Sequence, residues 1–180
     1  RSTQGVTLFP YTTLFRSDRD GRRRVAAPLA LVYFRERGEW YLAARDWLQG
    51  GTLSSGNNTY RVDMMRNVEA IAGSRFAYPD DFRIEDLFRD AWGMATGGPT
   101  VDVIVHFEND FNVPSKVMKV ARHREHARVE RLGDGSILYF DIVSGVDEFR
   151  AWIRGFGSSA QILAPDWLRA KHKEAVERLM

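Results

Sequence analysis

Short β-type segments, each closed by turn residues, dominate the first half of this chain and constrain its fold. Residues 24–34, 40–47 and 59–65 are rich in β-branched and aromatic side chains, and residues 67–71 continue the last of them. Glycine- and asparagine-rich turns separate these segments, and Pro28 marks an edge or a bulge because proline cannot donate to a strand ladder. Short strands at this spacing favour a small β-barrel over a β-α-β arrangement.

The pattern changes after residue 75. Pro79 begins a predicted helix in which Ile84, Leu87, Phe88 and Ala91 share one apolar stripe. The glycine-rich residues 96–99 then end that helix, so we expect a helical linker over residues 76–98 and a domain boundary at its end.

Residues 99–180 alternate between strand and helix patterns. We expect strands at 100–107, 127–132, 136–144 and 160–163, with Gly133-Asp134-Gly135 as a hairpin turn between the second and third. Helices are expected after Pro114, over residues 146–153 and after Pro165. The order βαββαβ with a terminal helix is ferredoxin-like, so the chain as a whole is predicted to be α+β.

The first 17 residues look foreign to the rest. Residues 7–17 resemble the translation of a common sequencing-adapter oligonucleotide, so we expect a non-native segment over 1–17 and native sequence from Asp18. A native N-terminal arm is the alternative. In either case residues 9–16 contain the Tyr, Thr, Leu and Phe side chains that suit a strand.

Composition removes several classes of function. Cysteine is absent, which excludes disulfides, thiolate metal ligands and thiol nucleophiles. No apolar run approaches the roughly 20 residues that cross a bilayer, and no segment has the order of a signal peptide. We therefore expect a cytoplasmic protein without a membrane partner. The formal net charge of +2 is too small for a non-specific nucleic-acid binder.

No motif indicates catalysis. A glycine-rich phosphate loop and a nucleophile elbow are both missing. His123 and His126 lack a third metal ligand in the sequence, and His106, with Glu108 and Asp110 beyond it, has no nucleophile partner. We expect no enzyme activity, no cofactor and no metal.

The candidate binding residues come from two strand segments. Alternation places Tyr41 and Arg45 on one strand face, and Arg61 and Asp63 together on another. If the two strands pair, these four side chains cluster outside the barrel, where a tyrosine can stack a base and arginines can hold phosphate. The alternative is a solvated, salt-bridged face in which Arg61 pairs with Asp63 or Asp46.

A second basic group surrounds the helix expected after Pro114. Lys116, Lys119 and His123 lie close to one helical face, and Arg122 and Arg128 are nearby. A solvated helix face is the simpler interpretation of this group.

The motifs together resemble the WYL-domain family of bacterial transcription regulators. The tripeptide Trp40-Tyr41-Leu42 gives that family its name, and residues 24–32 resemble its usual lead-in. Residues 60–68 resemble the family's second block, and residues 74–82 resemble the link that follows. Residues 133–136, 148–157 and 162–169 are similar to the C-terminal extension that such regulators carry.

The resemblance implies an Sm-like, SH3-type barrel over residues 18–75 and a ferredoxin-like extension over 99–180. It implies a ligand-sensing, homodimerising module with a nucleotide or single-stranded nucleic acid as effector. DNA would be reached only through an N-terminal winged helix-turn-helix, which we expect has been lost by truncation. The implied ligand-binding residues are Tyr41, Arg45, Arg61, Asp63, Arg66 and Arg24.

Two positions depart from the family pattern. Met64 stands where the family usually has a basic residue, and Asn58 stands where another is common. Fewer cations weaken a phosphate site, unless Arg45 or Arg66 substitutes. The departures favour an alternative function, an oligomerisation or interaction module that has lost effector binding.

Overall fold

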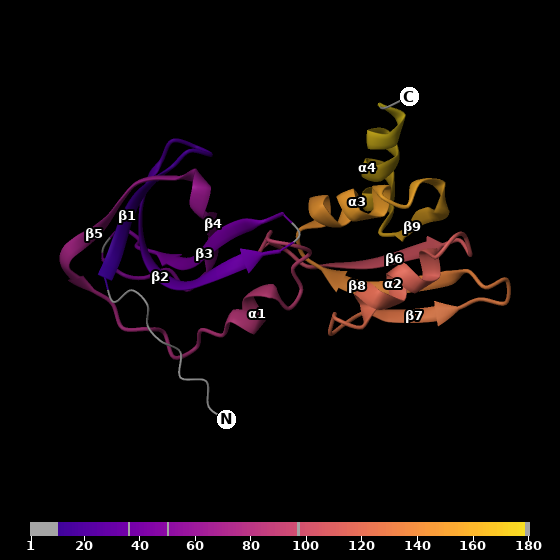
Figure 1. The fold of residues 1–180 in the computed structure, drawn as a ribbon, viewed down its shortest axis with the longest axis horizontal. Helices are drawn as coiled ribbons and strands as arrows, with labels where there is room; N and C mark the ends of the chain where they lie inside the picture. Colours follow the sequence, from indigo (N-terminus) through magenta and orange to yellow (C-terminus); the bar gives the residue numbers. More distant parts are fainter. Residues whose placement is uncertain (1–10, 36, 50, 97, 179–180) are drawn as a thin grey trace. The chain divides into compact units, whose positions relative to one another are not determined.

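The computed structural model describes residues 11–35, 37–49, 51–96 and 98–178 (Figure 1). The chain divides into two compact units, Arg1–Leu87 and Phe88–Met180. Each unit contains one antiparallel sheet, and helices accompany the second, so the predicted α+β class is confirmed. None of the described helices is long and apolar enough to cross a membrane.

Unit 1 is built on a five-stranded antiparallel sheet with the strand order β4-β3-β2-β1-β5. The expected strand at residues 9–16 is observed over Tyr11–Ser17, between β2 and β5. Pro28 coincides with a shift in the β2–β3 register, as the missing N–H predicts. The five strands are β1 Tyr11–Ser17, β2 Arg23–Phe34, β3 Glu39–Asp46, β4 Asn58–Arg61 and β5 Met65–Arg75.

The prediction of one strand over residues 59–65 is wrong. The strand β4 ends at Arg61, a 3-10 turn occupies Val62–Met64, and β5 begins at Met65. The break has a topological cause, because β4 pairs with β3 while β5 pairs with β1 on the other side of the sheet. Strand alternation therefore does not place Arg61 and Asp63 on one face.

Both faces of β3 are covered. On one face Leu42 and Ala44 pack with Phe15 and Ala26, and on the other Ala43 packs with Leu29 and Phe82. Phe82 belongs to the segment after β5, with the short helix α1 (Ile84–Phe88) immediately beyond it. This segment brings its own apolar residues onto the sheet face that was expected to be open.

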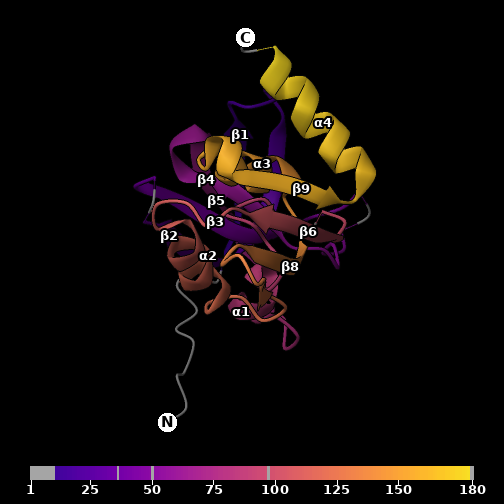
Figure 2. The same cartoon turned by 90° about the vertical axis from the view of Figure 1, so that its right-hand side faces the viewer.

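Unit 2 has the element order βαββαβα, as its sequence pattern predicts. Its four strands lie in the order β7-β8-β6-β9, and the helix α4 projects beyond β9 (Figures 1 and 2). Its buried core contains Phe107, Tyr139, Phe149 and Ile153. The elements are β6 Val101–Phe107, α2 Val113–Ala121, β7 Arg128–Arg131, β8 Ile137–Val143, α3 Val146–Arg154, β9 Ala160–Ala164 and α4 Asp166–Glu177.

The predicted linker helix is much shorter than its apolar stripe. Helix α1 ends at Phe88, and Ala91 instead forms a parallel bridge with Ser144 at the end of β8. Further along, the backbone N–H groups of Met94 and Ala95 donate to the Glu148 carboxylate, each at 3.0 Å. Contacts within unit 2 therefore replace helical hydrogen bonds over residues 91–95.

Candidate functional site

The two motif strands pair, as the expected cluster required, and Tyr41 lies directly opposite Arg61 in the β3–β4 register. The Arg61 guanidinium forms a two-point contact with Asp63, Nε to Oδ1 at 2.7 Å and Nη2 to Oδ2 at 2.8 Å. Its Nη1 lies 3.2 Å from Glu39, which also accepts a 2.7 Å hydrogen bond from the Tyr41 hydroxyl. Tyr41, Glu39, Arg61 and Asp63 thus form one connected polar chain.

Tyr41 does not project outward as expected. Its residue surface is only 8% exposed, so the ring is not free to stack a base. Burial raises the pKa of the Tyr41 phenol to about 12, with a further contribution from the hydrogen bond to Glu39. The hydroxyl therefore stays protonated and acts as a donor that orients Glu39 toward Arg61.

Arg45 is buried as well, at 8% exposure, which corrects its expected place in an open cluster. Two of its nitrogens contact the Asp81 carboxylate at 3.0 and 3.1 Å, and Nε donates to Asn57 at 2.9 Å. The cause is the packing of Phe82 on Ala43, which brings the preceding residue, Asp81, over the guanidinium. The hydrogen bonding from Arg45 lowers the pKa of the Asp81 carboxyl.

Arg24 belongs to a different cluster at the β1–β2 turn. Its Nη2 lies 2.6 Å from Asp20 and its Nη1 3.8 Å from Asp46, and the guanidinium lies 5.4 Å from the centre of the Tyr60 ring. The Tyr60 hydroxyl donates to Asp46, and burial raises the pKa of Tyr60. These contacts make Arg24 a part of the packing at this end of the sheet.

Arg66 is the most open of the four arginines, and it pairs with Asp18 through Nε at 2.7 Å. Each arginine of the candidate site therefore has a carboxylate partner. The Arg61–Asp63 pair is one of the contacts expected if these residues form a solvated, salt-bridged strand face. Sequence reasoning missed three members of this network, namely Glu39, Asn57 and Asp81.

A hollow of about 460 Å³ lies elsewhere in unit 1. Arg16, Arg23 and Asn67 contribute to its lining, and the six predicted ligand-binding residues do not. Across the described ranges, no group of three or more histidine or acidic side chains could hold a metal ion. His126 instead lies 3.3 Å from Asp90.

Comparison with known proteins gives two family matches. Residues 9–70 match the WYL domain and residues 99–180 match the WCX domain. The WYL match includes part of the adapter-like segment, in agreement with the pairing of β1 in the sheet. No curated protein matches the chain.

Two solved structures are similar over almost the whole chain. Proteasome accessory factor B/C (PafBC) of Arthrobacter aurescens is 17% identical, with a TM-score of 0.39, over 93% of this chain and 24% of that one. A CRISPR Cas-related protein is 11% identical, with a TM-score of 0.62, over 94% of this chain and 46% of that one. The second likeness shows a shared fold. The chain spans less than half the length of either structure.

Proposed function

The chain belongs to the WYL-domain family of regulators, and we propose that it is the ligand-sensing, dimerising region of a cytoplasmic bacterial transcription regulator. Its effector is a nucleotide or a single-stranded nucleic acid. DNA is reached through a separate DNA-binding domain. The family matches to a WYL and a WCX domain in one chain support this proposal.

We place an Sm-like barrel over residues 18–75, a linker over 76–98 and a ferredoxin-like domain over 99–180. The sheet order β4-β3-β2-β1-β5 supports the first assignment, because the first four strands pair in sequence order and β5 returns to pair with β1. The order βαββαβ supports the second, together with β6 and β8 at the centre of their sheet.

The observation that carries the effector proposal is the presentation of Arg61. Its side chain is one-third exposed, and the fork of Nε and Nη2 is already held in the two-point geometry that a phosphate oxygen pair also accepts. The occupant of that fork, Asp63, is 62% exposed. Exposed ion pairs stabilise a fold little, so a phosphate can displace Asp63 without disturbing the packing.

The other candidate residues have different roles in this proposal. Arg66 is exposed and adds a second positive charge once Asp18 is displaced. Tyr41 and Arg45 are buried, so they position Glu39 and the segment that carries Asp81 and do not touch the effector. Arg24 holds the Asp46–Tyr60 cluster in the same supporting way.

The test is fluorescence anisotropy with a labelled single-stranded DNA of about ten nucleotides, a length within the range of small barrel sites. We expect the parent chain to bind at low salt and to lose affinity as salt rises. Arg61→Ala should weaken binding about tenfold or more, since it removes a charge-assisted contact. The control is Arg75→Ala, which removes an exposed arginine over the Tyr11 ring. No binding at low salt, or equal loss in both variants, would contradict the proposal.

A second candidate function is an oligomerisation module without an effector. Tyr33 and Trp40 face each other across β2 and β3 with ring centres 5.1 Å apart, and each is about half exposed. Met64 and Asn58 also replace basic residues of the family pattern, and Asn58 donates to Asp46. Light scattering after size exclusion tests this function. If this function is correct, the parent chain is a dimer, Trp40→Ala dissociates it, and neither binds DNA. A strictly monomeric parent would reject this function.

A further inference from the structure

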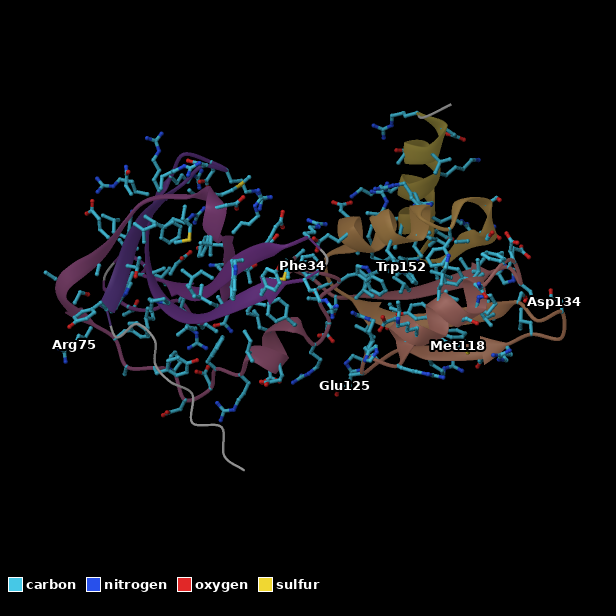
Figure 3. All side chains as sticks on the ribbon, in the orientation of Figure 1. Phe34, Arg75, Met118, Glu125, Asp134 and Trp152 are labelled. Carbon is cyan, nitrogen blue, oxygen red and sulfur yellow. The ribbon has the colours of Figure 1, made fainter. Side chains whose placement is uncertain are left out.

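Helix α2 and the turn that follows it carry basic side chains and no acidic ones up to residue 123. Val113, Pro114 and Val117 are buried against the sheet, and no acidic residue lies within the helix. The side chains of Lys116, Lys119, Arg122 and His123 are all exposed. We call these four residues the α2 cationic face. Figure 3 labels Met118 on this helix and Glu125 just beyond its end.

The charges of the α2 cationic face have no acidic partner in the described part of unit 2. Over residues 98–178, none of its four side chains lies within 4 Å of a carboxylate, since the neighbouring acids are engaged elsewhere. Glu125 lies 3.4 Å from Arg89, and Glu130 pairs with Arg128. Asp110, which precedes the helix, accepts hydrogen bonds from the Phe111 N–H and the Ser159 hydroxyl. The field of this face is therefore not neutralised by the protein itself.

The chemistry of the face indicates its partner. Protein interfaces have apolar, aromatic centres and are depleted in lysine. Two of the four members of the α2 cationic face are lysines. A row of exposed cations suits a partner that carries a regular line of negative charge, and the backbone of a nucleic acid is such a line.

The spacing agrees with this partner. Lys116, Lys119 and Arg122 follow one another at three-residue intervals, and Arg122 is the capping residue at the end of α2, so axial rises of about 4.5 Å separate them. One strand of duplex DNA carries a phosphate every 3.4 Å or so along its axis. The face, about 10 Å long, can therefore lie along about three consecutive phosphates.

We propose that α2 is a second nucleic-acid contact, which touches the phosphodiester backbone without reading bases. It acts through a local excess of cations, since the net charge of +2 is too small to hold nucleic acid non-specifically. The surface lies in unit 2 and is independent of the effector site proposed around Arg61 in unit 1. Duplex DNA distinguishes the α2 surface from the effector site, because its bases are stacked inside while its phosphate backbone is exposed. Neutralising three phosphates gives a slope of log K against log salt of about −2.7 for B-form DNA.

The experiment measures anisotropy of a labelled random-sequence duplex with the full 180-residue chain over a range of salt concentrations. The test variant is K116Q/K119Q/R122Q. The matched control is R169Q/K173Q/R178Q in and beside α4, which removes the same charge from cations that already have acidic partners in Asp166, Glu177 and Glu174. Glutamine is a good helix former, so both variants should keep the fold. Far-UV circular dichroism and a thermal melt check this.

We expect the α2 triple variant to bind duplex DNA at least tenfold more weakly than the parent at low salt. The slope of its log K against log salt should be less steep by about 2 to 3. The α4 triple variant should stay within about threefold of the parent, since its cations are already paired. Arg61→Ala should weaken duplex binding much less than the α2 triple variant does, whatever its effect on single-stranded DNA. Three outcomes would overturn the proposal. The parent does not bind duplex DNA at low salt, or the α2 and α4 variants lose the same affinity, or the parent binds polyglutamate but not duplex DNA.

Discussion

Arg45 in unit 1 and Arg124 in unit 2 are both largely buried guanidinium groups, but their carboxylate partners lie in opposite environments. Arg45 pairs with Asp81, whose side chain is 73% exposed. Arg124 pairs with Asp141, whose side chain is fully buried, and also donates to the carbonyls of Asp90, Ala91 and Ile142. Its guanidinium lies 4.6 Å from the centre of the Trp92 ring.

The difference shows which contact can be exchanged and which cannot. Water can solvate Asp81 if Arg45 releases it, so the segment around Phe82 is held mainly by apolar packing. Asp141 cannot reach water, and without Arg124 it would keep only the Tyr139 hydroxyl and the Ile142 N–H as donors. A buried charge left unpaired is expensive. Rearrangement of side chains is therefore easier around Arg45 in unit 1 than around the β8 strand of unit 2.

The largest effect is expected from Arg124→Met. It removes the charge partner of a buried carboxylate, which typically costs about 3–5 kcal/mol. The free energy of unfolding should be measured by urea denaturation, followed through tryptophan fluorescence because Trp92 lies against the lost guanidinium.

The matched control for Arg124→Met is Arg128→Met on the neighbouring strand β7, where the arginine pairs with Glu130 and both side chains are about half exposed. This change should cost well under about 1 kcal/mol. If the two variants unfold at the same urea concentration, Asp141 does not depend on its partner and the contrast between the units fails.

A smaller effect is expected from Phe82→Ala in unit 1. Truncating a buried phenylalanine in a core costs about 3–5 kcal/mol, and we expect about 2–3 here because the segment can lift off and leave no enclosed cavity. Hydrogen exchange should then increase over residues 76–87 and stay unchanged in unit 2. Phe82→Leu, which keeps most of the apolar contact with Leu29 and Ala43, is the control. Unchanged exchange in the alanine variant would show that something other than Phe82 holds the segment.

Local signals in the sequence predicted much of the fold. Alternating side chains and turn residues predicted the strand β3, and the change from strand to helix periodicity predicted the element order of unit 2. The burial of Arg45 was missed because it depends on Asp81 and Phe82, which return to β3 from a segment that local patterns assigned to a linker. Packing between residues far apart in the chain produces no periodic pattern in the amino-acid sequence.

The Arg124–Asp141 contact had a detectable signal. Asp141 falls on the same strand face as Ile137, Tyr139 and Val143, all of them buried. An acid in that pattern must find a cation or stay neutral. The identity of the cation could not be read from the sequence, because Arg124 lies in a turn 17 residues away with other basic residues around it.

The smallest effect is expected from Asp81→Asn, and its pH dependence distinguishes an exchangeable pair from a fixed one. The hydrogen bond from Arg45 holds the pKa of Asp81 below its ordinary value. A carboxyl whose pKa is lower in the folded state adds stability above its unfolded pKa of about 3.9 and loses it as the pH falls through the folded pKa. The parent should therefore melt slightly above the asparagine variant at pH 7, and the gap should close below about pH 4. Asp80→Asn, at an exposed neighbouring position, should show no gap at either pH. A difference in melting temperature that persists unchanged into acid would mean that Asp81 acts through packing and not through its charge.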